Sequence, residues 1–212
     1  MVIYAGLLPE LTSCESPRVL RLIKLPSHLV YIMIRQYLKK MQGTTISPPR
    51  VNRSEILWSW VGGFLGIASI GYINDKFCNG TDMIMLIGSF GASAVLLYGA
   101  VKSPLAQPRN LMGGHILSAI IGVTSYQLFS SHIWFASAAA VATAIAIMHM
   151  TKTLHPPGGA TALIAVIGGD KIHNLGYMYA LVPVGLGAAI MLIIALLVNN
   201  ISKSRKYPEF WF

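Results

Sequence analysis

The sequence predicts an all-α fold: a polytopic membrane helical bundle of about six spans, arranged as two inverted three-segment repeats. Of its 212 residues, 54% are hydrophobic and only 11% are charged, and the mean hydropathy is +0.61. Soluble domains carry about 25% charged residues. Apolar segments of the length that crosses a bilayer recur along the chain, and a short motif of small residues occurs twice. Together these observations indicate a membrane protein whose spans form two related sets.

Residues 1–54 are predicted to form a basic amphipathic segment followed by a linker. They contain half of the sixteen Lys and Arg residues. Apolar and basic residues alternate over 18–41, but the longest apolar run, 29–34, is far shorter than the ~20 residues of a span. We therefore expect 18–41 to lie on the membrane face, with an organellar targeting segment as the alternative. Residues 44–53 are expected to be a linker.

Six apolar segments follow in the predicted transmembrane domain, 55–200. The second is interrupted by Gly88, Gly91 and Gly99, the fifth is short and broken by prolines, and the sixth contains Pro183, which predicts a kink. The remaining residues, 201–212, form a basic tail whose aromatic end suits the membrane interface. The expected spans are 56–73, 83–101, 111–131, 132–150, 154–169 and 176–198.

The positions of the basic residues favour an even number of passes. With six passes, one side of the membrane receives the basic N-terminal segment, two loops and the tail, and the other side receives only Lys76 and Lys171. Lys and Arg are enriched on the inner side of membranes, so both termini are expected inside. We ascribe the formal charge of +9 to topology and to anionic lipid headgroups, and expect no nucleic-acid partner. Beyond residue 54, the inner cations would be Lys102, Arg109, Lys152, Lys203, Arg205 and Lys206.

The stretch 154–163, Leu-His-Pro-Pro-Gly-Gly-Ala-Thr-Ala-Leu, predicts a break inside the membrane. Pro156 and Pro157 lack an N–H and disfavour a helix before them. A helix is expected over 160–167, and its first amides, near 158–161, lack internal partners. Such a helix start favours an anion. In hydrocarbon, the break is tolerated only where it lines a cavity or is buried in protein.

A second copy of this motif lies earlier in the chain. Residues 91–96, Gly-Ala-Ser-Ala-Val-Leu, resemble residues 159–164, Gly-Ala-Thr-Ala-Leu-Ile, at an offset of 68 positions. Apolar segments flank both copies. Three passes in each repeat would place the two halves in opposite orientations, an arrangement that recurs in transporters with interrupted helices.

Several polar side chains near these motifs have both a functional and a structural interpretation. His155 is a substrate ligand or proton carrier, or it caps a helix end. Arg109 collects anions or anchors the inner end of its span. The hydroxyls bind an anion or cap a helix, while Gln107 and Asn110 are expected to bond the broken backbone of the second span. The predicted substrate-binding residues are His155, Pro156, Gly158, Gly159, Thr161, Ser89, Gly91, Ser93, Arg109 and His115.

Several classes of function are disfavoured by residues that the spans lack. No carboxylate falls inside an expected span. Cation transporters commonly place acids at depth, so an anionic or neutral substrate is favoured. Cys14 and Cys78 form no CxxC pair, and neither a metal nor a cofactor is expected. The sequence has no HExxH, no GxSxG and no pair of buried acids, so we expect no enzyme.

Three stretches resemble the HPP family of integral membrane proteins. They are 154–163 with its His-Pro-Pro triplet, 88–94 (Gly-Ser-Phe-Gly-Ala-Ser-Ala) and 103–110 (Ser-Pro-Leu-Ala-Gln-Pro-Arg-Asn), the last followed by Gly113-Gly114-His115. The resemblance covers roughly 55 to 212. Family members are usually described with four spans, whereas the count for this sequence is six. The two interrupted segments are where the two counts are expected to differ.

The resemblance implies transport, because chloroplast and cyanobacterial members of the family are associated with nitrite. We therefore expect a membrane transporter or channel for a small inorganic anion, with nitrite as the candidate substrate. A structural or assembly protein without transport activity is the alternative. The expected partners are the anion, membrane lipids and further copies of the chain in a homo-oligomer. A bacterial inner membrane and an organellar, chloroplast-type envelope both fit.

Overall fold

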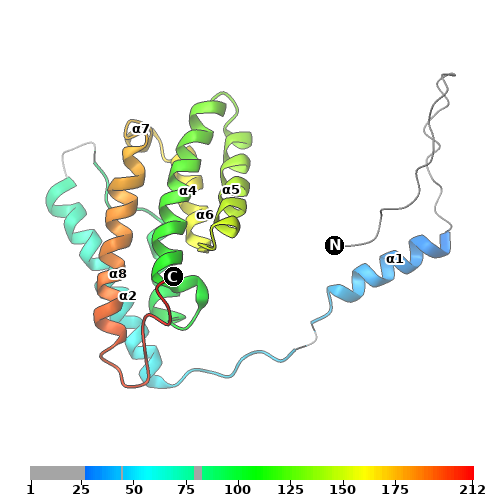
Figure 1. Ribbon diagram of the computed structural model, residues 1–212, viewed down its shortest axis with the longest axis horizontal. Helices are drawn as coiled ribbons and strands as arrows, with labels where there is room; N and C mark the ends of the chain where they lie inside the picture. Colours follow the sequence, from blue (N-terminus) through cyan, green and yellow to red (C-terminus); the bar gives the residue numbers. More distant parts are fainter. Residues whose placement is uncertain (1–26, 44, 79–82) are drawn as a thin grey trace. The chain divides into compact units, whose positions relative to one another are not determined.

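The computed structural model describes residues 27–43, 45–78 and 83–212, and in these ranges the regular structure is entirely helical (Figure 1). Contacts divide the chain into two units, Met1–Pro49 and Arg50–Phe212. In the first unit, α1 spans Ser27–Lys40 and ends on Lys39 and Lys40, cations that suit a helix C-terminus. The helix falls within the amphipathic segment predicted over 18–41. Residues 18–26 of that segment lie outside the described residues.

The second unit contains the apolar helices. Short π-helical turns (η1, η2, η4) extend or open three of them, and a 3₁₀ turn (η3) precedes the longest. The elements are α2 (Arg53–Ile73), η1 (Asn74–Cys78), α3 (Ser89–Ala94), η2 (Val95–Gly99), η3 (Pro104–Ala106), α4 (Pro108–Phe129), α5 (Ile133–Met150), α6 (Pro156–Ile167), α7 (Asp170–His173), η4 (Ala180–Gly185) and α8 (Leu186–Asn199).

The prediction of six helical spans is only partly reproduced. In the described residues three helices are both long and apolar enough to cross a membrane: Arg53–Cys78, Ile133–Met150 and Ala180–Asn199. The segments Ser89–Gly99 and Pro156–Ile167 are apolar but short. The kink predicted at Pro183 is confirmed, since Val182 before it has φ −133° and ψ 118° inside η4.

The expectation of a helix beginning at residue 83 is wrong. Residues 83–88 have no regular helical structure, and the helix begins at Ser89. The side chain of Asn74 explains how this backbone is satisfied, because its Oδ1 accepts hydrogen bonds from the amides of Met85 (2.9 Å) and Leu86 (3.3 Å). The second predicted span is therefore a segment without regular structure followed by a helix of about half the spanning length.

Helix α4 is the centre of the unit. It packs against α5 and α6, while α2 packs against α8 (Figure 1). Small residues allow the close approach of α4 to α6: a methyl group added at Gly122 would lie 2.5 Å from the carbonyl oxygen of Ala162. Four polar residues of α4 face the interior: His115 and Ser118 are fully buried, and Asn110 and Ser125 are nearly so.

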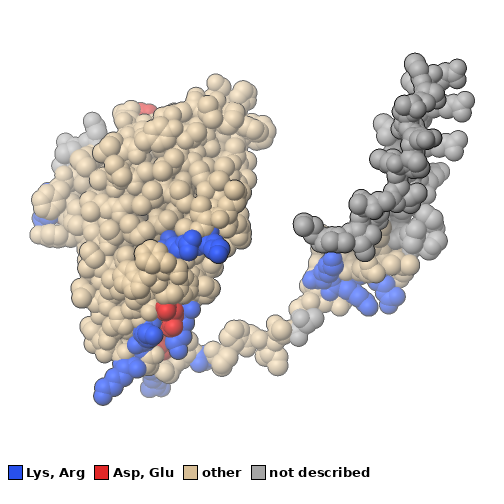
Figure 2. Space-filling view, in the orientation of Figure 1, with Lys and Arg blue, Asp and Glu red and all other residues tan. Residues whose placement is uncertain are grey.

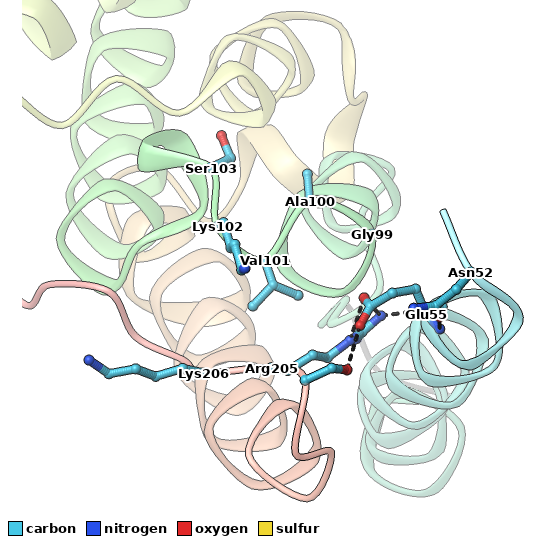
Figure 3. A pocket seen from close by; sticks show the side chains of 10 residues that line it. Asn52, Glu55, Gly99, Ala100, Val101, Lys102, Ser103, Arg205 and Lys206 are labelled. Atoms are coloured by element: carbon cyan, nitrogen blue, oxygen red, sulfur yellow. Dashed lines mark hydrogen bonds and ion pairs between the residues drawn. The ribbon is translucent and has the colours of Figure 1, made fainter. Parts of the chain in front are cut away.

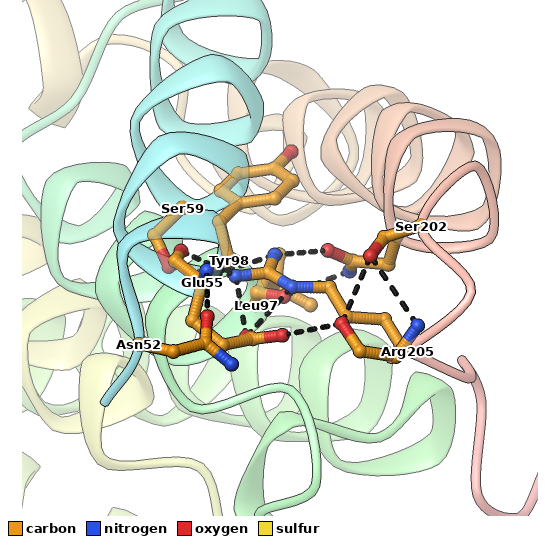
Figure 4. A network of polar contacts seen from close by, with 9 residues as sticks. Asn52, Glu55, Ser59, Leu97, Tyr98, Ser202 and Arg205 are labelled. Carbon is orange, nitrogen blue, oxygen red and sulfur yellow. Dashed lines mark hydrogen bonds and ion pairs between the residues drawn. The ribbon is translucent and has the colours of Figure 1, made fainter.

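The tail after α8 is attached to the helices of the second unit by a buried guanidinium group, that of Arg205. Arg205 donates through Nε and Nη2 to Glu55, and the two side chains form an ion pair of 2.8 Å (Figure 4). Its Nη1 donates to the Tyr98 carbonyl (3.2 Å) and to Asn199 Oδ1 (3.1 Å). Its side chain is 2% exposed. The Tyr98 carbonyl lies at the end of η2, where helix carbonyls lack internal partners. Arg205 thus fixes the start of α2, the end of η2 and the tail at one end of the unit.

Gly62 of α2 is predicted to be required for packing, whereas its neighbour Gly63 is not. A methyl group at Gly62 would lie 2.6 Å from Cδ1 of Tyr98, a ring held in the core by its hydrogen bond to the Met191 carbonyl (3.1 Å). Gly62→Ala should therefore destabilise the protein by about 1–3 kcal/mol. Thermal unfolding in detergent would measure this. Gly63→Ala, which adds its methyl group in open space, is the control and should be neutral; equal melting points for the two variants would contradict the packing.

Candidate functional site

Four of the side chains predicted to bind substrate meet inside the second unit. Ser93 comes from α3, His115 from α4, His155 from the residue before α6, and Thr161 from α6 itself. Each is fully buried, at 0% exposure. Ionisable side chains at membrane depth are rare and usually functional. These four residues, called the histidine cluster below, are the candidate functional site.

Hydroxyl groups link the two rings of the histidine cluster. Ser93 Oγ lies 2.7 Å from His115 Nε2 and 2.9 Å from His155 Nε2. Thr161 Oγ1 lies 2.7 Å from His115 Nδ1. The ring centroids of the two histidines are 5.0 Å apart. Both nitrogens of His115 are therefore held by hydroxyls, and both histidines share one serine.

The two hydroxyls on His115 come from equivalent positions of the repeated motif. Ser93 is the third residue of 91–96, and Thr161 is the third residue of 159–164. The helices that carry them run antiparallel, because Ser93 contacts His155 at the start of α6 while Gly88, five residues earlier, lies beside Ile164. One histidine of α4 therefore joins the two motif copies.

The direction of the hydrogen bonds follows from one carbonyl. His155 Nδ1 lies 2.8 Å from the Leu105 oxygen, which can only accept, so this nitrogen carries the proton. In a neutral His155, Nε2 then accepts from Ser93, and the serine oxygen accepts from His115 Nε2–H. Nδ1 of His115 is left to accept from Thr161. All donors in the neutral histidine cluster therefore point toward Leu105.

The local sequence explains why His155 points into the core. It precedes Pro156 and takes the extended conformation that prolines impose on the residue before them (φ −141°, ψ 103°). Asn110 of α4 holds the adjacent backbone by donating to the Leu154 carbonyl at 2.8 Å. Gly114 makes room for the ring, since a methyl group there would lie 2.5 Å from His155 Cβ. The prolines set the backbone and the glycine admits the side chain.

Ser89 and Gly158 also lie close to the histidine cluster. Ser89 is fully buried and one helical turn before Ser93; its Oγ is the only buried side-chain nitrogen or oxygen in the described residues without a hydrogen-bond partner. Buried polar groups are almost always paired, so this hydroxyl is available to a ligand. Gly158 packs against α4, where a methyl group would lie 2.7 Å from the Gly114 carbonyl oxygen.

The structure places the remaining predicted site residues elsewhere. Gly91 and Pro156 are exposed. Gly159 lines a separate apolar hollow of about 480 Å³, together with Val141 and Leu163. Arg109 donates through Nη2 to the Thr151 carbonyl at 2.7 Å, which ties the start of α4 to the end of α5. Four predicted residues thus form the histidine cluster and two adjoin it, while the structure does not bring these other four to it.

The start of α6 offers fewer bare amides than the sequence predicted. Its first two residues, Pro156 and Pro157, have no N–H. The next amide, of Gly158, donates to the His155 carbonyl at 2.8 Å. At α3, the amides of Phe90 and Gly91 likewise donate to carbonyls three residues earlier. Side chains of the histidine cluster, rather than helix amides, are therefore the main polar groups here.

A second hollow, of about 550 Å³, lies beside the loop after η2 (Figure 3). Three basic residues line it, Lys102, Arg205 and Lys206, and one acidic residue, Glu55, which pairs with Arg205. Ser103 belongs to this lining, and Leu105, two residues later, accepts the hydrogen bond from His155. The loop 103–107 therefore lies between the basic hollow and the histidine cluster.

Side chains from both directions hold this loop. Gln107 Nε2 donates to the carbonyls of Val101 (3.1 Å) and Ser103 (2.8 Å). Gln107 was predicted to bond the broken backbone of the second span, and it contacts that span at its last residue, Val101. From the tail, Tyr207 donates its hydroxyl to the Ala106 carbonyl at 2.8 Å, and the Glu209 amide donates to Gln107 Oε1 at 2.8 Å. Asn110 instead bonds Leu154, away from the second span.

Sequence reasoning missed the backbone acceptor and the tail. The carbonyl of Leu105 has no side-chain signature, although its loop is one of the three stretches that carried the family resemblance. The pairing of Arg205 with Glu55 could have been anticipated from the prediction that the start of the first span and the basic tail share one side. Among the described residues, no group of three or more His, Cys, Asp or Glu side chains could hold a metal ion.

Comparison with known proteins identifies the family. The model of the HPP transmembrane region matches residues 48–208, most of the chain. The chain belongs to the HPP transmembrane family. Two proteins of Dictyostelium discoideum, each named only as a transmembrane protein, are 47% identical over 180 residues and 45% identical over 188 residues. The matches cover 84% and 86% of this HPP protein and 58% and 66% of those relatives, so the chain spans less than two thirds of their length. No solved structure matches it.

Thr161 is predicted to stabilise this HPP protein through His115. Replacing Thr161 with Val keeps the shape but removes the hydroxyl on Nδ1, which leaves a buried nitrogen unpaired and should cost about 1–3 kcal/mol. Thermal unfolding in detergent would measure the loss. Thr143→Val on the exposed side of α5 is the matched control and should leave the melting point unchanged. A melting point of Thr161→Val equal to that of the control would mean that this hydrogen bond adds nothing.

Proposed function

We propose that this HPP membrane protein transports a small inorganic anion, with nitrite as the candidate substrate, through a path that passes the histidine cluster. The observation that carries the proposal is the meeting of Ser93 and Thr161 on His115. Equivalent hydroxyls from two antiparallel helices converge on one ionisable side chain at the centre of an apolar unit. Polar sites built from interrupted helices near the membrane midplane are characteristic of transporters.

The lengths of the two helices support a site at mid-depth. The segment Ser89–Gly99 and helix α6, of 12 residues, rise about 16–18 Å at 1.5 Å per residue. A bilayer core is about 30 Å thick. Each helix therefore covers about half the depth, and each begins near the histidine cluster. We infer that the two halves of the chain are inverted repeats of three membrane segments, with α2, α3–η2 and α4 in the first and α5, α6 and η4–α8 in the second.

The charges support an anion over a cation. The described carboxylates lie at helix ends or in loops and tail, at Glu55, Asp75, Asp170 and Glu209, so none lies at the histidine cluster. The basic hollow carries three cations and one acid. Figure 2 shows Lys and Arg side chains gathered at the end of the second unit where α2 begins. A basic mouth raises the local concentration of anions.

The loop 103–107 closes the way between the basic hollow and the histidine cluster, so this conformation corresponds to a closed state. Opening would break the hydrogen bond from His155 to Leu105 and move the loop against the tail residues Tyr207 and Glu209. The free hydroxyl of Ser89 would then donate to the anion. Loop movements of this kind are common in gated sites.

The second candidate is a structural role, in which the histidine cluster only ties α3, α4 and α6 together. The complete burial of its four side chains favours that alternative. Flux separates the two candidates, because a purely structural cluster carries no solute.

His155 is predicted to be required for uptake. Purified protein in liposomes should take up nitrite faster than protein-free liposomes, and His155→Ala should lower that rate by about tenfold or more, since tenfold corresponds to about 1.4 kcal/mol and the variant loses two buried hydrogen bonds. His149→Ala, which changes an exposed histidine of α5, is the control and should transport normally. Size-exclusion profiles would establish that both variants fold. Equal uptake by the two variants would remove His155 from the path.

The lysines of the basic hollow are predicted to set the apparent affinity. The double variant Lys102→Gln, Lys206→Gln should raise the half-saturating nitrite concentration about three- to tenfold and leave the maximal rate unchanged, because it weakens electrostatic attraction at the mouth only. Added salt should reduce the difference between variant and wild type. Lys76→Gln, in η1 beyond the C-terminal end of α2, is the control. A changed maximal rate with unchanged half-saturation would contradict this role.

A further inference from the structure

The histidine cluster has no permanent positive charge with which to hold an anion. Within the described residues, its polar contacts are with each other, with the carbonyls of Leu105 and Pro157, and, through the Thr161 carbonyl, with the hydroxyl of Tyr179. Arg109, on the same helix as His115, is bonded to the Thr151 carbonyl, and Arg205 is paired with Glu55. An anion taken out of water without a counter-charge is strongly disfavoured.

We propose that the two histidines take up one proton with each anion, which makes the protein an electroneutral anion–proton symporter. This inference rests on the proposed function. The proton comes from the solution on the side from which the anion enters, and it leaves with the anion on the other side. No covalent bond of the anion forms or breaks. The protonated imidazole supplies the counter-charge that no lysine or arginine in the described residues supplies there.

The hydrogen-bond geometry accommodates one added proton without leaving a donor unpaired. If His115 gains a proton on Nδ1, it donates to Thr161 Oγ1 instead of accepting from it. The Thr161 hydroxyl then turns to its second acceptor, the Pro157 carbonyl at 3.3 Å. Ser93 still donates to His155, and His155 still donates to Leu105.

The same proton can reside on His155 instead. In that arrangement His155 Nε2–H donates to Ser93, Ser93 donates to His115 Nε2, and His115 Nδ1–H donates to Thr161. Ser93 thus passes the proton between the rings by exchanging one hydroxyl hydrogen for another. Both placements satisfy every donor of the histidine cluster, so the proton is shared by the pair.

A second proton does not fit. With both rings charged, Ser93 Oγ would accept from both Nε2–H groups, at 2.7 and 2.9 Å, and its own hydrogen would have no acceptor among the residues that line it. The two positive rings would also lie 5.0 Å apart, with no acidic side chain among their described contacts. Like charges at that separation disfavour double protonation. The pair therefore carries one proton, which fixes the stoichiometry at one proton per monovalent anion.

The test is to measure protons and charge alongside nitrite. The full chain is reconstituted in liposomes that contain a pH-sensitive dye, and sodium nitrite is added outside. Protein-free liposomes give the background of nitrous acid that crosses unaided. We expect one proton to enter per nitrite above that background, and an uptake rate that does not respond to a membrane potential set with potassium and valinomycin. Nitrite uptake that follows the membrane potential without internal acidification would overturn proton coupling and leave anion transport standing.

Variants at Ser93 test the shared proton. Ser93→Ala removes the hydroxyl between the rings and should reduce proton-coupled uptake by about tenfold. Ser93→Thr, which repeats the residue of the second motif, should retain coupling. If Ser93→Ala fails to fold in the size-exclusion profile, the wild-type stoichiometry alone decides the matter. The absence of nitrite uptake above background in the folded wild type would reject the proposed function, and this inference with it. Full coupling in folded Ser93→Ala would show that the proton does not pass through the pair.

Discussion

The pairing of both His115 nitrogens with hydroxyls is the interaction on which the interior of the second unit depends. Away from water, an imidazole must find partners within the protein, because an unpaired nitrogen there is costly. His115 finds them on two helices of half length, neither of which crosses the unit alone. The requirement to satisfy one polar side chain thus positions α3 and the first half of α6 beside the first half of α4.

This arrangement needs small residues around it. Gly114 admits His155, Gly158 packs on the backbone of α4, and Gly122, about two turns after Gly114 on α4, lies against Ala162. In lipid, the hydrophobic effect does not drive one helix onto another, so close van der Waals contact and hydrogen bonds must hold them. The glycines of α4 and α6 permit contact between backbones, and the hydrogen bonds of the histidine cluster fix their register. Close backbone packing and the hydrogen bonds of the histidine cluster therefore both stabilise the contact between α4 and α6.

Much of the helical unit could be predicted because its signals are local. Apolar length located α2, α5 and α8, and the two prolines at 156 and 157 located the break before α6. The start of α3 could not be located in this way, because residues 83–88 are as apolar as a helix. They have no regular helical structure, and the side chain of Asn74 accepts hydrogen bonds from the amides of Met85 and Leu86. For the tail, the predicted topology could indicate only that Arg205 and Glu55 share one side of the membrane; the contacts of Arg205 with η2 and α8 depend on the folded arrangement.

For the site, the residue types could be predicted but their roles could not. His155, His115, Ser93 and Thr161 were recognisable from the repeated motif and its flanks. Their mutual hydrogen bonds depend on the antiparallel crossing of α3 and α6, which spacing along the chain does not encode. The sequence pattern predicted too many free amides at the start of α6. The prolines that create the break also remove two of its backbone donors. The main polar groups at the start of α6 are therefore side chains of the histidine cluster and not backbone amides.

The bond between Arg205 and Glu55 has a consequence for biosynthesis. The two residues are 150 positions apart, so the base of the helical unit cannot close until Arg205, which follows all of its helices, has left the ribosome. Until then, the carbonyl at the end of η2 and the carboxylate of Glu55 must rely on water or lipid headgroups. Insertion of the helices and completion of the fold are therefore separate events in time, and the second waits for the segment after α8 to be translated.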